Sequence, residues 1–401
     1  MNLDTIQKLV KDSGKKIVFL VLDGLGGLPR ETGGLTELET AHTPNMDRLA
    51  AEGICGLHRP VGAGLTPGSG PGHLGIFGYD PLKYQVGRGV LAALGVGFDL
   101  GYDDVAARGN FCTVDDEGLV TDRRAGRIAT EKNEELCGLL SKIKIKGAEL
   151  FIRTVKEHRF LLVLRGRGLS GGLADTDPQE TGKAPLEPEI LSDDAGKTAE
   201  ILREFLDKAA KALADQHPAN MVLMRGFAKR PRWPSMKEAF GVRSAAIAAY
   251  PMYRGLGKLI GMEVLRTGET VADEIDSLRD NWNSYDFFYV HVKKSDSYGE
   301  DGDFDHKVKV IEETDELIPR VLDLKPDVLA VTGDHSTPSV LKAHSWHPVP
   351  TLLWSPYCRT DGVESFGERS CMGGGLGPSF PAAELVPIAL ANALRLEKFG
   401  A

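Results

Sequence analysis

The stretch IVFLVLDGLGG, residues 17–27, combines a short apolar run with a polar stop. Ile17 to Leu22 are apolar and rich in β-branched residues, which is typical of a strand buried on both faces. Such strands occur in parallel sheets, whose ligands bind beyond the carboxyl ends of the strands. Asp23 ends the run, and the glycines after it favour a sharp turn. The stretch therefore predicts a buried strand with Asp23 at the ligand-binding edge of a sheet.

The same pattern occurs twice more toward the C-terminus. FFYVHV (287–292) predicts a strand followed by a loop that contains Asp296, and VLAV (328–331) predicts a strand followed by Asp334. Because the carboxyl ends of parallel strands meet at one edge of a sheet, we expect three acidic residues to gather there. Three acidic residues at three strand ends are the main organisational feature of the chain.

Helices are predicted between these strands. TPNMDRLAAEG (43–53) places Thr43 at the N-cap, Pro44 at the first helical position and Gly53 at the end. Residues 307–322 carry apolar side chains near helical spacing. Strands that alternate with helices predict an α/β fold with a doubly wound, mostly parallel sheet.

The middle of the chain has a different pattern. Shorter strands are predicted at 151–155, 159–164 and 221–224, between charged helices and Gly/Asp/Pro-rich connections. We expect residues 86–239 to form an α+β domain inserted into the first. Residues 1–85 and 240–401 would then form one discontinuous domain.

Composition and charge restrict the class of protein. Lys and Arg number 48 and Asp and Glu 57, so the net charge is −9, which argues against general nucleic-acid binding. Neither a signal peptide nor an apolar run of about 18 residues is present, so no membrane partner is expected. The 5 cysteines show no CxxC spacing and are expected to be free thiols in a reducing, cytoplasmic compartment. The sequence does not indicate an oligomeric state.

Histidines and carboxylates cluster near two of the predicted strand ends. His335 follows Asp334, and His344 comes within a dozen residues; the segment DSYGEDGD (296–303) holds Asp296, Glu300 and two further acids. Carboxylates this dense repel one another unless a cation offsets them, so the pattern predicts a metal site. The alternatives are a solvated or calcium-binding loop at 296–303, and histidines of the surface or core.

A glycine-rich segment supplies a candidate nucleophile. LTPGSGPGHLGIFGYDP (65–81) places Ser69 between glycines and His73 four residues later. The segment fits neither the GxSxG pattern nor a Walker P-loop. A bound metal could activate the Ser69 hydroxyl to attack phosphorus, whereas the plain alternative is an ordinary Gly/Pro loop.

Basic residues of the middle region are candidates for binding an anionic, phosphorylated small molecule, because the guanidinium fork matches phosphate and carboxylate groups. Lys258 and Arg254, in YRGLGKLIG, are further candidates. The middle-region candidates are Arg88, Arg123, Arg124, Arg127, His158 and Arg159.

HTPNMDRLAAEG and GDHSTP followed by AHSWHPVP resemble motifs of the alkaline phosphatase superfamily. More narrowly, TPGSGPGHLGIFGYDPLKYQVGRGVLAALGVGFDL, ARGNFCTVDDEGLVTDRRAGRI, EHRFLLVLRGRGLS and the C-terminal GGGLG resemble archaeal-type cofactor-independent phosphoglycerate mutases. The similarity runs through nearly the whole chain. It implies an alkaline-phosphatase-like catalytic domain with an inserted substrate-binding cap, and two divalent metal ions, manganese or magnesium.

The resemblance also implies roles for individual residues. Ser69 would take the phosphoryl group from 3-phosphoglycerate and return it to give 2-phosphoglycerate without bisphosphoglycerate, and His73 would contact the phosphoryl group or transfer a proton. The metal ligands carried over by motif are Asp23, Asp334, His335 and the Ser69 oxygen for one ion, and Asp296, His344 and Glu300 for the other.

Two positions depart from the family pattern. Glu300 stands where the family usually has His, and Gly70 follows the nucleophile where archaeal members often have Asp. Two alternative functions therefore stay open. One is a metal-dependent phosphotransferase or phosphatase acting on another small molecule, such as a homoserine-kinase-like relative. The other is a non-enzymatic binding protein whose site has decayed.

Overall fold

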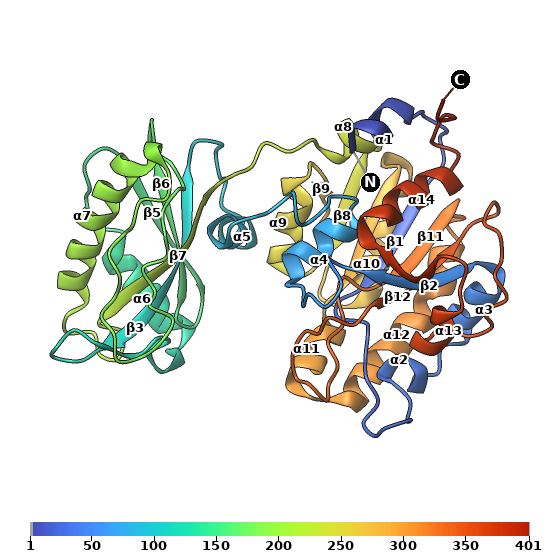
Figure 1. Cartoon of the computed structure of the whole chain (residues 1–401), viewed down its shortest axis with the longest axis horizontal. Helices are drawn as coiled ribbons and strands as arrows, with labels where there is room; N and C mark the ends of the chain where they lie inside the picture. The colour runs from blue at the N-terminus through green and yellow to red at the C-terminus, as the bar shows by residue number, and fades with distance from the viewer. Residues whose placement is uncertain (1–2, 401) are drawn as a thin grey trace. The chain divides into compact units, whose positions relative to one another are not determined.

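The computed structural model describes residues 3–400, which divide into two compact units (Figure 1). The first unit runs up to Gln85 and resumes at Trp233, and the inserted unit is Val86–Arg232. The predicted insertion ended at residue 239, whereas the structure places 233–239 in the first unit. The reason is that α8 (Met236–Phe240) belongs to that unit: the Met236 N–H donates to the Ile260 carbonyl.

The first unit is built on an eight-stranded sheet in the order β13-β2-β12-β11-β1-β10-β8-β9. β1 is central and pairs in parallel with both β10 and β11, and β8 and β9 continue the parallel part. The prediction of a mostly parallel sheet is confirmed, although β12 runs antiparallel to both neighbours. The strands are β1 (Ile17–Leu22), β2 (Ile54–Arg59), β8 (Ser244–Ala248), β9 (Glu263–Val264), β10 (Phe287–Val292), β11 (Val328–Thr332), β12 (Val349–Trp354) and β13 (Gly377–Pro381).

Both faces of this sheet are buried, as the apolar strand sequences predict. Every residue of β1, β10 and β11 is buried. Val18 and Leu20 of β1 pack in one core with Leu49, Leu278 and Ile311 of three helices on one face, and the alternate side chains point to the other. The helices of this unit are α1 (Leu3–Leu9), α2 (Glu37–Thr40), α3 (Pro44–Glu52), α4 (Ser69–Ile76), α8, α9 (Pro251–Leu259), α10 (Val271–Asp280), α11 (Lys294–Asp301), α12 (Phe304–Leu322), α13 (Glu368–Met372) and α14 (Leu385–Asn392).

Helix α3 begins and ends where the sequence predicts, but its N-terminal cap has a different source. Thr43 occupies the N-cap position without a side-chain hydrogen bond to the helix. The buried carboxylate of Asp315, in α12, accepts instead from the N–H groups of Asn45 at 3.1 Å and Met46 at 2.7 Å. A distant residue thus satisfies two of the free N–H groups that every helix N-terminus leaves.

The inserted unit is an α+β fold whose strands pair antiparallel, with β3 bonded to β4, β6 and β7. Helices α6 and α7 cover one face, where they share a core with Phe111, Leu162 and Met224. The elements are α5 (Arg88–Gly95), β3 (Val105–Val114), β4 (Val120–Asp122), α6 (Thr130–Leu140), β5 (Glu149–Lys156), β6 (Arg159–Arg165), α7 (Gly196–Leu213) and β7 (Met221–Lys229). Among residues 3–400, no helix is long and apolar enough to cross a bilayer.

One buried acid makes the stability of the first unit depend on pH. Glu274 of α10 is 3% exposed, and its only hydrogen bond described here comes from the Ala249 N–H at 3.3 Å. Burial raises the pKa of Glu274 to about 8. Since the pKa is higher in the folded than in the unfolded chain, the folded chain keeps the proton longer. Its stability therefore falls as pH rises from about 4.5 toward 8.

We expect Glu274→Gln to remove this dependence, because an amide occupies the same place without ionising. Between pH 6 and pH 8 the native chain should lose about 2 kcal/mol more stability than the variant. Thermal unfolding of metal-free protein at both pH values measures the difference. Glu364→Gln, at an exposed acid, is the control and should behave as the native chain. Equal pH dependence in all three proteins would show that Glu274 is ionised when folded.

Candidate metal and phosphoryl-transfer site

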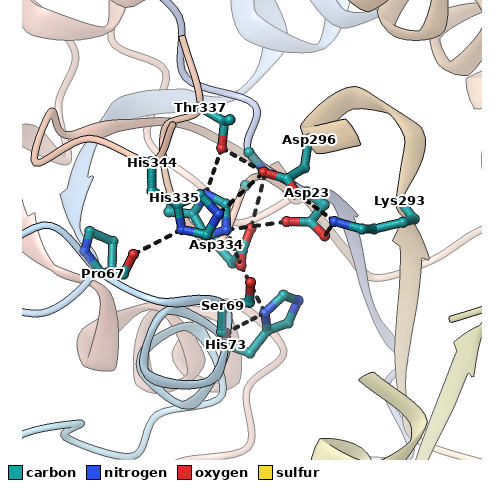
Figure 2. Close-up of polar contacts among 12 residues, drawn as sticks. Asp23, Pro67, Ser69, His73, Lys293, Asp296, Asp334, His335, Thr337 and His344 are labelled. Atoms are coloured by element: carbon teal, nitrogen blue, oxygen red, sulfur yellow. Dashed lines mark hydrogen bonds and ion pairs between the residues drawn. The ribbon is translucent and has the colours of Figure 1, made fainter. Parts of the chain in front are cut away.

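The three predicted acidic residues converge because their strands are neighbours. β11, β1 and β10 lie side by side and in parallel, with Leu22 opposite Val292 and Val21 opposite Thr332. Asp23 and Asp334 directly follow β1 and β11, and Asp296 lies in the first turn of α11 after β10. All three are at most 1% exposed. Figure 2 shows their carboxylates turned toward one another.

A first group consists of Asp23, Asp334 and His335. The Nε2 of His335 lies 3.3 Å from Asp23 Oδ1 and 3.1 Å from Asp334 Oδ2. These three atoms have no hydrogen-bond partner in the described part of the chain. The other ring nitrogen, Nδ1, lies 3.0 Å from the hydroxyl of Thr337, which donates its own hydrogen to Asp296 at 2.6 Å. His335 Nδ1 is therefore the donor, and Nε2 faces two carboxylates with its lone pair.

A second group contains Asp296, His344 and Glu300. His344 Nδ1 lies 2.9 Å from the carbonyl of Pro67, which can only accept, so this nitrogen carries the proton. Its Nε2 lone pair then faces Asp296 Oδ1 at 3.5 Å and Glu300 Oε1 at 3.6 Å. The Glu300 side chain is 55% exposed, and burial together with the charge of Asp296 raises its pKa. His335 also lies near this group, but its Nε2 can serve only one ion.

Lone pairs that face carboxylate oxygens repel them, so each group lacks a positive charge at its centre. Protonating His335 is not the remedy, since burial holds the pKa of His335 well below its usual value. A divalent cation bound between these oxygen and nitrogen atoms would satisfy all of them, and carboxylate and imidazole ligands suit manganese, magnesium or zinc. The residues therefore fit bound divalent metal.

Residues that the sequence did not single out complete the first group. The Lys293 ammonium lies 3.0 Å from Asp23 Oδ2 and also contacts Asp296. His291 Nε2 lies 3.3 Å from the same Asp23 oxygen, and the Tyr253 hydroxyl donates to it. The only signals in the sequence were a histidine inside an apolar strand and a basic pair after it. Both patterns are common in proteins without a metal.

These neighbours shift the pKa values of the Asp23 and Asp334 carboxyl groups in opposite directions. Burial alone would raise the pKa of Asp23, but the hydrogen bond from His291 and the charge of Lys293 hold it well below its usual value. Burial and the charge of Asp23 raise the pKa of Asp334 well above its usual value. The pKa values of these two neighbouring carboxyl groups are therefore shifted in opposite directions.

Ser69 and His73 lie on α4, beside this cluster (Figure 2). Ser69 is the first residue of the helix, where free N–H groups favour an anion. His73 Nδ1 lies 2.9 Å from the Ser69 carbonyl, to which it donates, and the same nitrogen lies 2.9 Å from Asp334 Oδ2. Gly72 permits the approach, because a Cβ there would lie 2.5 Å from the Asp334 carbonyl oxygen. Burial lowers the pKa of His73 to about 4, so the ring is neutral.

Lys258, predicted to contact the phosphoryl group, is exposed on α9 and has no contact with the cluster in the described structure. Arg254, one turn earlier on α9, is half-buried and follows Tyr253, whose hydroxyl reaches Asp23. The sequence offered both residues as candidates without distinguishing between them.

The inserted unit carries arginines on the sheet face opposite the core that α6 and α7 cover. Arg108 of β3 lies directly opposite Arg225 of β7, although like charges in this position are destabilising. Arg225 is 3.3 Å from Asp175. Arg108 Nε is buried without a hydrogen-bond partner in the described chain, and burial and nearby arginines lower the Arg108 pKa to about 10. The pair was not among the candidates, because the sequence did not show which strand face is open.

The basic residues of this unit that were predicted to bind substrate differ in their exposure and in their partners. Arg159 extends the arginine face, opposite Asn110 of β3. Arg123 is held by Asp177 in a two-point pair at 2.9 and 2.8 Å. His158 is buried, and burial together with neighbouring arginines lowers its pKa to about 4. The exposed candidates are Arg88, Arg124 and Arg127.

Comparison with known proteins identifies the family. Residues 50–220 match the family described as 2,3-bisphosphoglycerate-independent phosphoglycerate mutase. A probable 2,3-bisphosphoglycerate-independent phosphoglycerate mutase of Aquifex aeolicus is 52% identical over 409 residues, covering 100% of both chains. One of Thermotoga neapolitana is 54% identical over 398 residues, covering 99% of this chain and 98% of the relative.

Solved structures of similar proteins support the same assignment. A cofactor-independent phosphoglycerate mutase from Thermoplasma acidophilum is 30% identical with a TM-score of 0.73, covering 94% of this chain and 100% of that one. A protein from Pyrococcus horikoshii is 32% identical with a TM-score of 0.81, covering 96% and 99%. The chain therefore belongs to the family of 2,3-bisphosphoglycerate-independent phosphoglycerate mutases.

Proposed function

We propose that this isomerase interconverts 3-phosphoglycerate and 2-phosphoglycerate through a phosphoserine at Ser69, at a site that holds two divalent metal ions. The observation that carries the proposal is the pair of imidazole lone pairs, on His335 and His344, that face carboxylates beside the N-terminus of α4. Nothing in the site favours a phosphotransferase or phosphatase acting on another small molecule.

The metal ligands would divide into two sets. Asp23, Asp334 and His335, with the Ser69 oxygen, would hold one ion, and Asp296, His344 and Glu300 the other. Since carboxylate oxygens outnumber imidazole nitrogens, the sites favour manganese or magnesium. The ions supply positive charge that lowers the pKa of the Ser69 hydroxyl and offsets the charge of the transferring phosphoryl group.

The residues of the chain then carry out two transfers. The Ser69 hydroxyl gives up its proton as its oxygen attacks phosphorus, the bond from phosphorus to the C3 oxygen breaks, and that leaving oxygen takes up one proton, so that glycerate is released within the site with no net change in protons. After glycerate reorients, its C2 hydroxyl loses a proton and attacks the phosphoserine, which restores Ser69. His73 holds the Ser69 backbone against Asp334 during both steps, and Lys293 lies close enough to stabilise anionic oxygens.

The arginine face of the inserted unit supplies the substrate's anion partner. Arg108 and Arg225 face each other, and although Arg225 pairs with Asp175 and Asp177, Arg108 has no ion pair in the described residues. Arg159 lies on the same face. A carboxylate or phosphate group would relieve this repulsion and bind by two-point hydrogen bonds. We propose that the inserted unit binds an anionic group of the substrate there.

We expect Ser69→Ala to lower kcat by roughly a thousandfold or more, because no other hydroxyl can accept the phosphoryl group. A coupled assay with 3-phosphoglycerate, without bisphosphoglycerate, measures kcat, and elemental analysis checks that metal content is retained. Thr66→Ala, at an exposed hydroxyl in the same loop, is the control and should keep native activity. Substantial mutase activity in Ser69→Ala would remove Ser69 from the mechanism.

Removal of divalent ions with a chelator should abolish activity, and manganese or magnesium should restore it, because the uncompensated carboxylates and lone pairs need a cation. Metal should also raise the melting temperature, since an ion at a hundred times its Kd adds about 2.7 kcal/mol to stability. Activity and thermal unfolding before and after metal addition test both effects. A chelated, metal-free enzyme with full activity would contradict the assignment.

Arg108→Met should lower kcat/KM by roughly ten- to a hundredfold, the value of one charged hydrogen bond of about 1.5–3 kcal/mol. The same change should leave the melting temperature of substrate-free protein unchanged or higher, because it removes a buried charge opposite Arg225. Arg203→Met, on helix α7 at the covered face, is the matched control. Native kcat/KM in Arg108→Met would exclude this arginine from substrate binding.

A further inference from the structure

Lys307 is a fully buried lysine whose ion pair in the described residues, with buried Glu37, is a long one. It lies in the first turns of α12 and is 0% exposed. Its nearest carboxylate oxygen, on Glu37, is 3.9 Å away. Burying an ammonium costs several kcal/mol unless its hydrogen-bonding capacity is met. The position therefore needs an explanation beyond packing.

Three backbone carbonyls meet the three N–H groups of this ammonium. The Lys307 Nζ donates to Gly24 at 2.9 Å, Gly26 at 3.1 Å and Thr337 at 2.9 Å. An ammonium has three donors and no acceptor, so its capacity is filled. Carbonyl oxygens that point at one centre repel one another, and the buried cation offsets that repulsion.

The carbonyls belong to the two loops that carry the proposed metal ligands. Gly24 follows Asp23, and its N–H donates to Asp334 Oδ1 at 3.1 Å. The Thr337 hydroxyl donates to Asp296 and accepts from His335. Through its carbonyl partners, Lys307 thus reaches ligands of both groups without touching any of them.

We propose that Lys307 is a positioning residue. Its ammonium group holds the loops after β1 and β11 in the geometry that binds metal. The inference rests on the proposed metal site. Without the ammonium, the three carbonyls must turn away from one another toward water. Thr337 would move with its carbonyl, and Asp296 and His335 would lose the hydroxyl that orients them.

The test compares Lys307→Met and Lys307→Ala with Lys309→Met and Lys309→Ala, at an exposed lysine of the same helix whose ion pair with Glu313 is 3.8 Å long. Manganese affinity of chelator-treated protein is measured by calorimetry, and hydrogen exchange follows the peptides around 23–27 and 335–339. Both Lys307 variants should bind manganese roughly ten- to a hundredfold more weakly, the effect typical of groups that orient metal ligands. The Lys309 variants should bind as the native chain does.

Chemical rescue separates the ammonium from packing. Ethylammonium should restore manganese affinity to Lys307→Ala, whose truncation leaves room for it, and not to Lys307→Met. Tetramethylammonium, which has no N–H donor, should restore neither. Native affinity in folded Lys307→Met, equal rescue by both salts, or no rescue by ethylammonium would overturn the inference.

Failure of the proposed metal site can be told apart from failure of the proposed role of Lys307. If the native chain binds no manganese, the proposed metal site fails, whereas equal binding by native and Lys307→Met protein refutes only the role of Lys307. Should both neutral variants fail to fold, Lys307→Arg replaces them, because a guanidinium keeps the charge but cannot direct three N–H groups at three carbonyls. Weakened manganese binding by folded Lys307→Arg supports the inference, and native binding contradicts it.

Discussion

The site depends on one electrostatic constraint: imidazole lone pairs are held against carboxylate oxygens in a buried place. His335 and His344 cannot turn away, because the Thr337 hydroxyl and the Pro67 carbonyl occupy their Nδ1 atoms. Burial keeps His335 neutral, so protonation does not relieve the repulsion. The fold thus maintains an arrangement that is unfavourable without cations and becomes favourable with them.

The rest of the first unit maintains this arrangement. Three adjacent parallel strands deliver the acids to one edge. Gly24 adopts a positive φ of 65°, and a Cβ there would lie 2.5 Å from the Thr337 hydroxyl oxygen, so only glycine lets the two loops approach. The Lys307 ammonium holds the same two loops together. Ser69 is placed by the helix that Gly72 brings against Asp334. The close approaches that these glycines permit therefore place the proposed cation sites beside the Ser69 hydroxyl.

The sequence was sufficient for the features set by local pattern. Apolar runs ending in Asp23 and Asp334 predicted the strands, the parallel sheet and the edge where acids meet. Features set by contacts between distant residues were not predictable. Asp315 caps α3 from a different helix, and His291 and Tyr253 reach Asp23 only once β1, β10 and α9 have packed.

Contacts between distant residues also decide features of the inserted unit and its boundary. Arg108 and Arg225 become a pair through strand register, and a single sequence does not reveal which strand face the helices leave uncovered. Residues 233–239 were predicted to belong to the inserted domain, yet α8 folds onto the first unit.

The most direct test of the central claim is anomalous X-ray diffraction from crystals grown with manganese. The account predicts two peaks, one about 2 Å from His335 Nε2, between Asp23 and Asp334, and one about 2 Å from His344 Nε2, beside Asp296. Absence of manganese at both places, with Asp334 protonated and donating to His335 Nε2, would contradict it.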